Sequence, residues 1–174
     1  GMSVHSILVP DGEAEKSVQR WSWLVGEILG LGVDRQTPIV AVGGGVVGDL
    51  AGFAAATVMR GLPLVQVPTS LLAMVDSSVG GKTAINTPHG KNLIGSFHQP
   101  SLVYASVDCL QHLPEVELKS GLGEVVKHGM LADASLLSAC RTKHDLILGR
   151  ETKILEELVV RSVRVKSSFV VADE

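Results

Sequence analysis

The sequence predicts an α/β fold, with a Rossmann-like nucleotide-binding domain over residues 1–113 and the first helices of an all-helical domain over residues 114–174. Three observations lead to this prediction. Short apolar runs suited to buried parallel strands alternate with helical patterns in the first part. A glycine-rich turn follows one of these runs and opens a helix. After Pro114 the pattern is helical throughout, which places a domain boundary there.

The first expected elements are a strand at Ser6–Pro10, a helix at Lys16–Leu31 and a strand at Pro38–Val42. The first strand ends in a Pro-Asp-Gly turn signal. The helix has apolar residues at helical spacing, and Gly32 suits its C-terminal stop. The second strand is almost entirely apolar, as expected for a strand covered on both faces of a parallel sheet.

The remaining elements alternate in the same way. A helix rich in small residues follows the glycine turn and runs to about Met59, and strands are expected at 64–67 and 102–107. The segment 75–95 is rich in Gly, Ser and Asn, which predicts a long functional loop with room for a hairpin. A strongly helical segment, Glu151–Asp173, reaches the end of the chain without a capping stop, so we expect a truncated helical domain.

Composition excludes several classes of function. The 174 residues carry a net charge of −3, and the basic residues are scattered, so neither nucleic acid nor an anionic membrane is an expected partner. Aromatic residues make up only 3%, which argues against base stacking. No apolar run approaches the roughly 20 residues that span a bilayer. Two cysteines without CxxC spacing indicate reduced thiols in a cytoplasmic protein.

The glycine turn is the strongest local motif. Gly43-x-Gly45-x-x-Gly48 fits the dinucleotide fingerprint, in which glycines let the backbone approach a pyrophosphate and free N–H groups at the helix start attract its charge. A tight turn without a ligand would show the same spacing. The acidic residue expected about 20 positions later is missing around residues 62–72, so Asp49, or Glu13 with Lys16, is an alternative partner for ribose hydroxyls.

Six motifs in order carry a resemblance to a known family. They are Pro10-Asp-Gly-Glu-Ala-Glu-Lys16, Gly43-Gly-Gly-Val-Val-Gly-Asp49, Pro68-Thr-Ser70, Asp76-Ser-Ser-Val-Gly-Gly-Lys82, Gly90-Lys-Asn92 and Gly121-Leu-Gly-Glu-Val-Val-Lys127. Together they resemble 3-dehydroquinate synthase over nearly the whole chain. The resemblance implies a dehydroquinate synthase-like fold and the central part of a homodimeric protein about twice as long. Other sugar-phosphate cyclases, such as 2-deoxy-scyllo-inosose synthase, and a non-catalytic nucleotide-binding module are the alternatives.

The resemblance also implies roles for particular residues. NAD contacts are expected at Asp11, Gly12, Glu13, Lys16, Gly45, Val46, Val47, Gly48, Asp49, Thr69, Ser70, Lys82, Lys91, Cys109 and His112. A sugar phosphate substrate is expected at Arg60, Asp76, Lys82, Asn92 and Lys127, and a divalent metal, zinc or cobalt, at Glu124. The family usually has a threonine where His112 stands.

Plainer interpretations of the same residues stay open. Thr69 and Ser70 could cap a helix, the polar loop could be solvated, and Glu124, Lys127 and His128 could form a charged solvent face because they lie at i, i+3 and i+4.

The implied reaction is a cyclisation with elimination of phosphate. In the family, NAD oxidises a ring hydroxyl of 3-deoxy-D-arabino-heptulosonate 7-phosphate, phosphate leaves, the hydride returns, and aldol closure gives 3-dehydroquinate. A catalytic zinc needs about three protein ligands, and none of the six histidines here sits in the family's metal-binding motif. We therefore expect this fragment to be inactive by itself.

Overall fold

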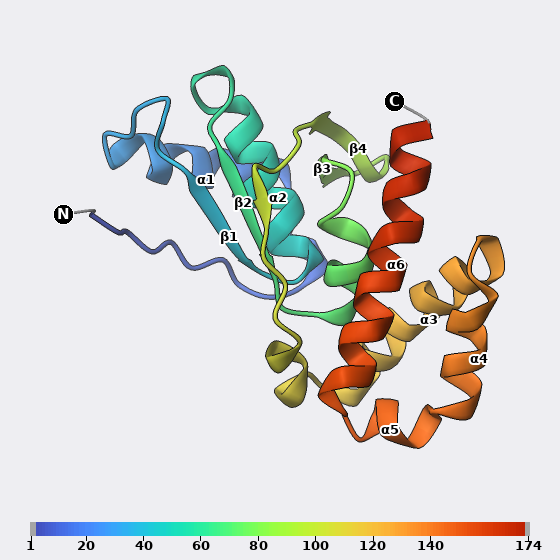
Figure 1. Ribbon diagram of the computed structural model, residues 1–174. Helices are drawn as coiled ribbons and strands as arrows, with labels where there is room; N and C mark the ends of the chain where they lie inside the picture. The colour runs from blue at the N-terminus through green and yellow to red at the C-terminus, as the bar shows by residue number, and fades with distance from the viewer. Residues whose placement is uncertain (1–2, 173–174) are drawn as a thin grey trace.

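The computed structural model describes residues 3–172. The chain forms two neighbouring parts, a small parallel sheet with helices α1 and α2, and a group of helices α3 to α6 (Figure 1). An antiparallel hairpin, β3 and β4, lies between α2 and the C-terminal half of α6 (Figure 1). Within the described residues no helix is both long enough and apolar enough to cross a membrane.

The parallel sheet has the order β1-β2-β5. Strand β1 (Ile39–Gly43) pairs with β2 (Leu64–Pro68), and helix α2 (Gly45–Thr57) is the crossover between them. The two strands lie close to their expected positions, because continuous apolar runs favour a buried parallel sheet. Strand β5 is only Leu102–Val103, shorter than the expected 102–107, because the Ser106 side chain accepts a hydrogen bond from Asp108 N and starts the turn η4 (Val107–His112).

The strand expected at Ser6–Pro10 is wrong. These residues are not assigned to a strand and are mostly exposed, although Ile7 and Val9 pack against the core beneath α1 and α2. A strand requires a partner for its backbone N–H and C=O groups, and β1 pairs with β2 instead. The β propensity of these residues therefore did not lead to a strand, because they do not pair with a neighbouring strand.

The predicted loop is more ordered than its composition indicates. It forms the short π-helix η3 (Ala73–Ser77), then β3 (Lys82–Thr87) and β4 (Gly90–Phe97), which pair antiparallel. Gly80 and Gly81 have φ of +99° and +65° and turn the chain between η3 and β3. The hairpin packs so closely on α2 that a Cβ on Gly52 would lie 2.5 Å from Thr83 Cγ2.

Helix α1 (Val18–Gly30) begins at the Ser17 cap, whose side chain accepts from Arg20 N, and Gly32 follows it with φ +69°, close to the expected bounds. The helices of the second part are α3 (Glu115–Leu131), α4 (Ala134–Thr142), α5 (His144–Leu148) and α6 (Thr152–Ala172). Asp173, the expected end of α6, lies outside the described residues.

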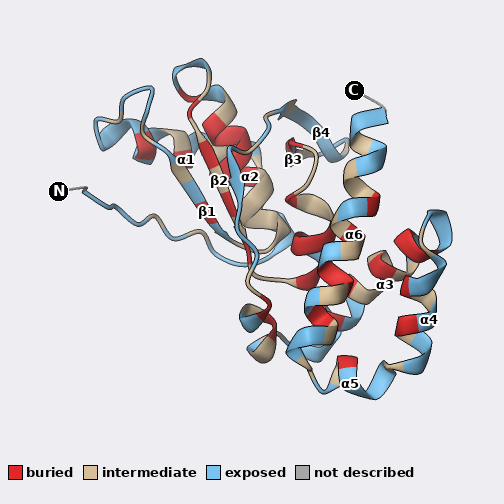
Figure 2. Ribbon diagram, viewed as in Figure 1, coloured by how far each residue is buried: buried red, intermediate tan, exposed pale blue. Residues whose placement is uncertain are grey.

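The largest core joins the helices to the segment before the hairpin. Leu71, Met74 and Val75 near η3 pack with α3 and α6 residues such as Leu118 and Leu158. Buried positions accordingly line the inner faces of η3, α3 and α6 (Figure 2). The domain boundary at 113/114 stays a prediction, since this core contains residues from both sides of it.

Candidate functional site

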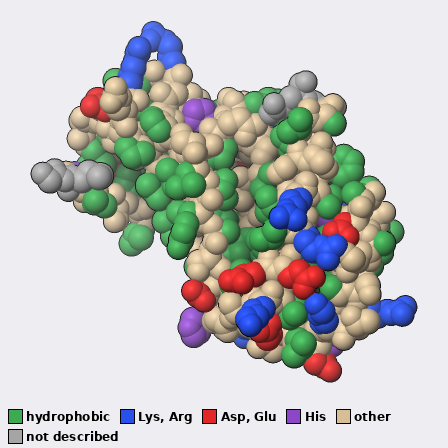
Figure 3. Space-filling model, in the orientation of Figure 1, with side chains coloured by type: hydrophobic (Ala, Val, Ile, Leu, Met, Phe, Trp, Pro, Cys, Tyr) green, Lys and Arg blue, Asp and Glu red, His purple; other side chains and the backbone are tan. Residues whose placement is uncertain are grey.

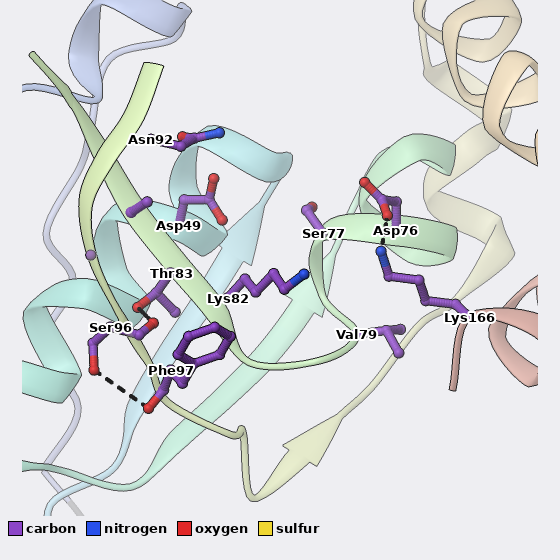
Figure 4. A pocket seen from close by; sticks show the side chains of 12 residues that line it. Asp49, Asp76, Ser77, Val79, Lys82, Thr83, Asn92, Ser96, Phe97 and Lys166 are labelled. Atoms are coloured by element: carbon purple, nitrogen blue, oxygen red, sulfur yellow. Dashed lines mark hydrogen bonds and ion pairs between the residues drawn. The ribbon is translucent and has the colours of Figure 1, made fainter. Parts of the chain in front are cut away.

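A cavity of about 390 Å³ opens between α2, η3, the hairpin and α6. Its lining residues are Asp49, Asp76, Ser77, Val79, Lys82, Thr83, Ala84, Asn92, Gly95, Ser96, Phe97 and Lys166. Four of the sequence-predicted residues, Asp49, Asp76, Lys82 and Asn92, thus meet around one cavity (Figure 4). They come from three segments of the chain, so only folding brings them together.

The glycine turn sits at the start of α2. Gly44 is the N-cap, and no side chain accepts a hydrogen bond from the first turn of the helix. A Cβ on Gly45 would lie 3.1 Å from Ser77 Oγ, and a Cβ on Gly48 would lie 2.9 Å from Gln66 Oε1, so these glycines let neighbouring side chains pack on the helix. Free N–H groups at a helix start attract a phosphate group. The residues present therefore fit a dinucleotide pyrophosphate.

Lys16 is buried behind the cavity, with 4% of its surface exposed. Its Nζ donates to Asp49 Oδ2 and to Asn92 Oδ1, both at 2.6 Å, and lies 3.9 Å from Glu13 Oε1. Burial raises the pKa of Asp49, and the hydrogen bond and charge of Lys16 oppose this shift. The predicted cofactor-binding lysine is therefore engaged with protein groups.

A second group of contacts surrounds Glu13. Asn86 Nδ2 donates to Glu13 Oε1 at 2.9 Å, and Lys91 Nζ lies 3.7 Å from the same oxygen. Partial burial raises the pKa of Glu13, but the Asn86 hydrogen bond and the charges of Lys16 and Lys91 outweigh it and lower the pKa overall. Asp11 is exposed, and Gly12 has φ +107° directly before the short turn η1 (Glu13–Glu15).

On the opposite wall, Asp76 meets a residue that the sequence reasoning missed. Lys166 Nζ, from α6, donates to Asp76 Oδ1 at 2.6 Å across 90 positions of sequence, and both side chains line the cavity. The sequence pattern of α6 indicated only a helix. The helical spacing did contain a signal for the position of Lys166. Lys166 directly follows the buried Val165 and lies four residues after the buried Ser162, so it shares a helix face with Ser162.

The predicted metal-binding residue forms its own cluster on α3. Glu124 Oε1 lies 2.8 Å from Lys127 Nζ and 3.3 Å from His128 Nε2, so the expected shared helix face is confirmed. The hydrogen bond and charge of Glu124 raise the pKa of the Lys127 ammonium, whereas burial lowers the pKa of His128. Residues 3–172 contain no group of three or more His, Cys, Asp or Glu side chains that could hold a metal. These residues alone therefore do not fit a catalytic metal.

The other predicted residues lie outside the cavity lining. Arg60 is exposed and has φ +68° in the turn between α2 and β2. Ser70 Oγ accepts from Ala73 N at 3.3 Å, which agrees with the helix-cap interpretation, and Thr69 N donates to Gly43 O. Both Cys109 and His112 belong to η4; Cys109 packs on the helical core, and His112 is exposed.

The surface differs between the two parts of the molecule. Charged side chains gather over the helices, whereas hydrophobic side chains dominate the visible face of the sheet (Figure 3). On the sheet, Val40, Val42 and Leu102 are each more than half exposed. Several charges on the helices are paired, for example Arg161 with Asp133 at 2.8 Å and Lys143 with Glu157 at 2.9 Å.

Comparison with known proteins gives consistent matches over the chain. A family model described as 3-dehydroquinate synthase N-terminal matches residues 6–120, and one described as 3-dehydroquinate synthase C-terminal matches residues 121–174. A 3-dehydroquinate synthase of Symbiobacterium thermophilum is 50% identical over 173 residues, covering 99% of this chain and 48% of the relative. One of Caulobacter vibrioides is 51% identical over 174 residues, covering 100% and 47%. The chain spans about half the length of the curated relatives it matches.

Solved structures agree on the fold. A 2-epi-5-epi-valiolone synthase from Streptomyces hygroscopicus subsp. jinggangensis, with NAD⁺ and Zn²⁺ bound, has a TM-score of 0.90 at 28% identity, covering 95% of this chain and 47% of that one. A 2-deoxy-scyllo-inosose synthase complexed with carbaglucose-6-phosphate, NAD⁺ and Co²⁺ has a TM-score of 0.80 at 32% identity, covering 92% and 44%.

Proposed function

The chain belongs to the 3-dehydroquinate synthase family, and we propose that it is the cofactor-binding part of an enzyme that converts 3-deoxy-D-arabino-heptulosonate 7-phosphate to 3-dehydroquinate and phosphate. The observation that carries the proposal is the cavity, where Asp49, Asp76, Lys82 and Asn92 meet beside the glycine turn. The curated relatives named 3-dehydroquinate synthase, at about 50% identity, favour this reaction within the family.

NAD is the proposed cofactor, and its nicotinamide would accept a hydride from a substrate hydroxyl and later return it. The start of α2 would hold the pyrophosphate on the free N–H groups of Gly45, Val46 and Val47. Asp49 would accept hydrogen bonds from ribose or substrate hydroxyls through the oxygen that Lys16 leaves free. Thr69, Ser70, Lys91, Cys109 and His112 stay proposed cofactor contacts.

The proposed substrate groups around the cavity are cations, carboxylates and an amide. Lys82 is exposed on β3 at the cavity and can neutralise a phosphate, and Lys166 supplies a second cation on the opposite wall. Carboxylate and amide groups at Asp76 and Asn92 suit hydroxyls. Arg60 and Lys127 lie outside the lining and remain proposals from the family pattern.

A divalent metal, zinc or cobalt, is proposed for the complete enzyme, with Glu124 as the single ligand that this chain contributes. The other ligands must come from elsewhere in the longer protein, because a catalytic zinc uses about three protein ligands. We accordingly propose that the 174-residue chain is inactive by itself and that the complete protein is a cytoplasmic lyase acting as a homodimer.

The experiment that tests the function is an assay of phosphate release and 3-dehydroquinate formation by the intact protein with NAD and zinc or cobalt. The same protein is offered glucose 6-phosphate, because the 2-deoxy-scyllo-inosose synthase likeness makes another sugar-phosphate cyclase the alternative. Turnover of glucose 6-phosphate alone would replace the proposed reaction with the alternative. NAD binding without turnover of either sugar would favour a non-catalytic module.

A further inference from the structure

We propose that Lys16 is a positioning residue that orients Asn92 and Asp49 so that together they bind one hydroxyl group of the ligand in the cavity. Its Nζ lies 2.6 Å from Asn92 Oδ1 and 2.6 Å from Asp49 Oδ2. Lys16 itself does not belong to the cavity lining, whereas both of its partners do. It therefore acts on the ligand through them.

The chemistry of lysine fixes which end of the Asn92 amide faces the cavity. An ammonium group has three donors and no acceptor, so the amide atom turned toward it must be the carbonyl oxygen. The NH₂ group of Asn92 is then left for the cavity and offers donors. Without the lysine, the amide could rotate and present either end.

The same lysine also determines which oxygen of the Asp49 carboxylate can accept a hydrogen bond from the ligand. One carboxylate oxygen is held by Lys16, and the other oxygen is left as an acceptor. Asp49 and Asn92 touch the same Nζ and lie on the same side of the cavity (Figure 4). A donor and an acceptor side by side suit a hydroxyl, which both accepts and donates. The Asp49 carboxylate disfavours a phosphate or carboxylate at this point by charge repulsion.

The backbone of Asn92 is held independently of Lys16 Nζ. Asn92 has φ +57°, and its N–H donates to Asn86 Oδ1 at 3.0 Å. Asn86 N donates to Lys16 O at 2.7 Å, and its side chain donates to Glu13. Removal of the ammonium should therefore release the Asn92 amide without releasing the turn that carries it.

The test compares three variants of the intact protein, the first being Lys16→Met, which keeps an unbranched side chain without the ammonium group. Lys16→Met/Asp49→Asn also removes the carboxylate left unpaired, so it guards against loss of folding, and in it the orientation of the unaltered Asn92 is followed by the NMR measurement below. Lys143→Met is the matched control, because it breaks a lysine–glutamate pair at 2.9 Å outside the cavity.

We expect both Lys16 variants to raise a KM by about tenfold, the effect of roughly one lost hydrogen bond, with a smaller change in kcat. The inference rests on the proposed function for the identity of the ligand, and the assay therefore has two arms. A rise in the sugar phosphate KM places the hydroxyl on the substrate, and a rise in the NAD KM places it on the cofactor ribose. Unchanged KM values for both in the double variant would overturn the proposal.

An independent measurement does not need turnover. In the ¹⁵N NMR spectrum of the intact protein labelled at asparagine, the Asn92 side-chain NH₂ should be rigid in the parent protein and in Lys143→Met, and mobile in both Lys16 variants. If the parent protein proves inactive on every sugar phosphate, the proposed function fails while this measurement still decides the role of Lys16. An equally rigid Asn92 amide in Lys16→Met would show that the lysine does not orient it.

Discussion

Two lysines, Lys16 behind one wall of the cavity and Lys166 in the opposite wall, each hold an aspartate at 2.6 Å, but in different surroundings. The Lys16 side chain is 5% exposed and its partner Asp49 16% exposed, whereas the Lys166 and Asp76 side chains are 24% and 33% exposed. Lys16 also donates to Asn92, whereas Lys166 donates to Asp76. In the first pair only the aspartate reaches the cavity and the lysine is enclosed by protein, whereas both members of the second pair line the cavity.

The difference in burial gives the two pairs different roles. A buried charge must keep its partner, because an uncompensated buried ion is costly. An exposed pair contributes little to stability and can exchange its partner for a ligand at low cost. We therefore regard the Lys16 side of the cavity as a fixed wall and the Lys166 side as the wall that can respond to a ligand.

Lys16→Met should give the largest loss of stability. It leaves the Asp49 carboxylate buried without its cation, and breaking a buried pair typically costs several kcal/mol, here about 3 kcal/mol in the free energy of unfolding. Urea unfolding monitored by circular dichroism measures this. Lys143→Met, whose pair is 37% exposed on both sides, should change the same quantity by less than about 0.5 kcal/mol. Equal losses in the two variants would contradict the contrast.

Asn92→Ala and Asn92→Gly distinguish the cost of the backbone conformation at residue 92 from the loss of the amide contact with the ligand. Asn92 has φ +57°, which costs an alanine about 1–2 kcal/mol and a glycine little. We expect the alanine variant to be the less stable of the two by about 1 kcal/mol in chemical denaturation. Both should lose affinity for the ligand in calorimetric titration, since both lack the amide. A glycine variant with normal affinity would remove Asn92 from the site.

Lys166→Met should change stability by no more than about 1 kcal/mol, because its pair is partly exposed. Its effect should fall on function, with kcat/KM for the sugar phosphate reduced about tenfold or more through the loss of a cation at the cavity. Steady-state kinetics and urea unfolding of the same sample measure both. A variant less stable than Lys16→Met would reverse the assignment of the two walls.

The smallest effect concerns acid sensitivity of the helical part. A hydrogen bond from Ser135 and the Arg161 guanidinium lower the pKa of Asp133 below its ordinary value of 3.8. Because the folded-state pKa is depressed, this group stabilises the fold above pH 3.8, and that contribution is lost as the pH falls through the folded-state pKa. Asp133→Asn should therefore be less stable than the parent protein at pH 7, and this difference in stability should disappear below pH 3.8. A difference in stability that stays constant down to pH 2 would contradict the prediction.

Much of the local structure could be predicted from the sequence. Apolar periodicity located β1, β2 and α1, and the glycine spacing located the start of α2. The segment 6–10 failed because a strand depends on a partner that local propensity does not supply. The π-helix η3 was hidden because glycine- and serine-rich composition resembles a loop, whereas Met74 and Val75 are fixed by burial in the helical core.

The site shows the same division between local pattern and long-range contact. By itself the sequence determined the chemistry available: glycines that clear a helix start, and aspartate, asparagine and lysine side chains in ordered motifs that identify the family. Which of these groups meet depends on how the chain packs in three dimensions. This packing buried Lys16 against Asn92, 76 positions away, and brought Lys166 to Asp76 across 90 positions. Burial and partner choice depend on the packing of distant segments, which no local pattern encodes.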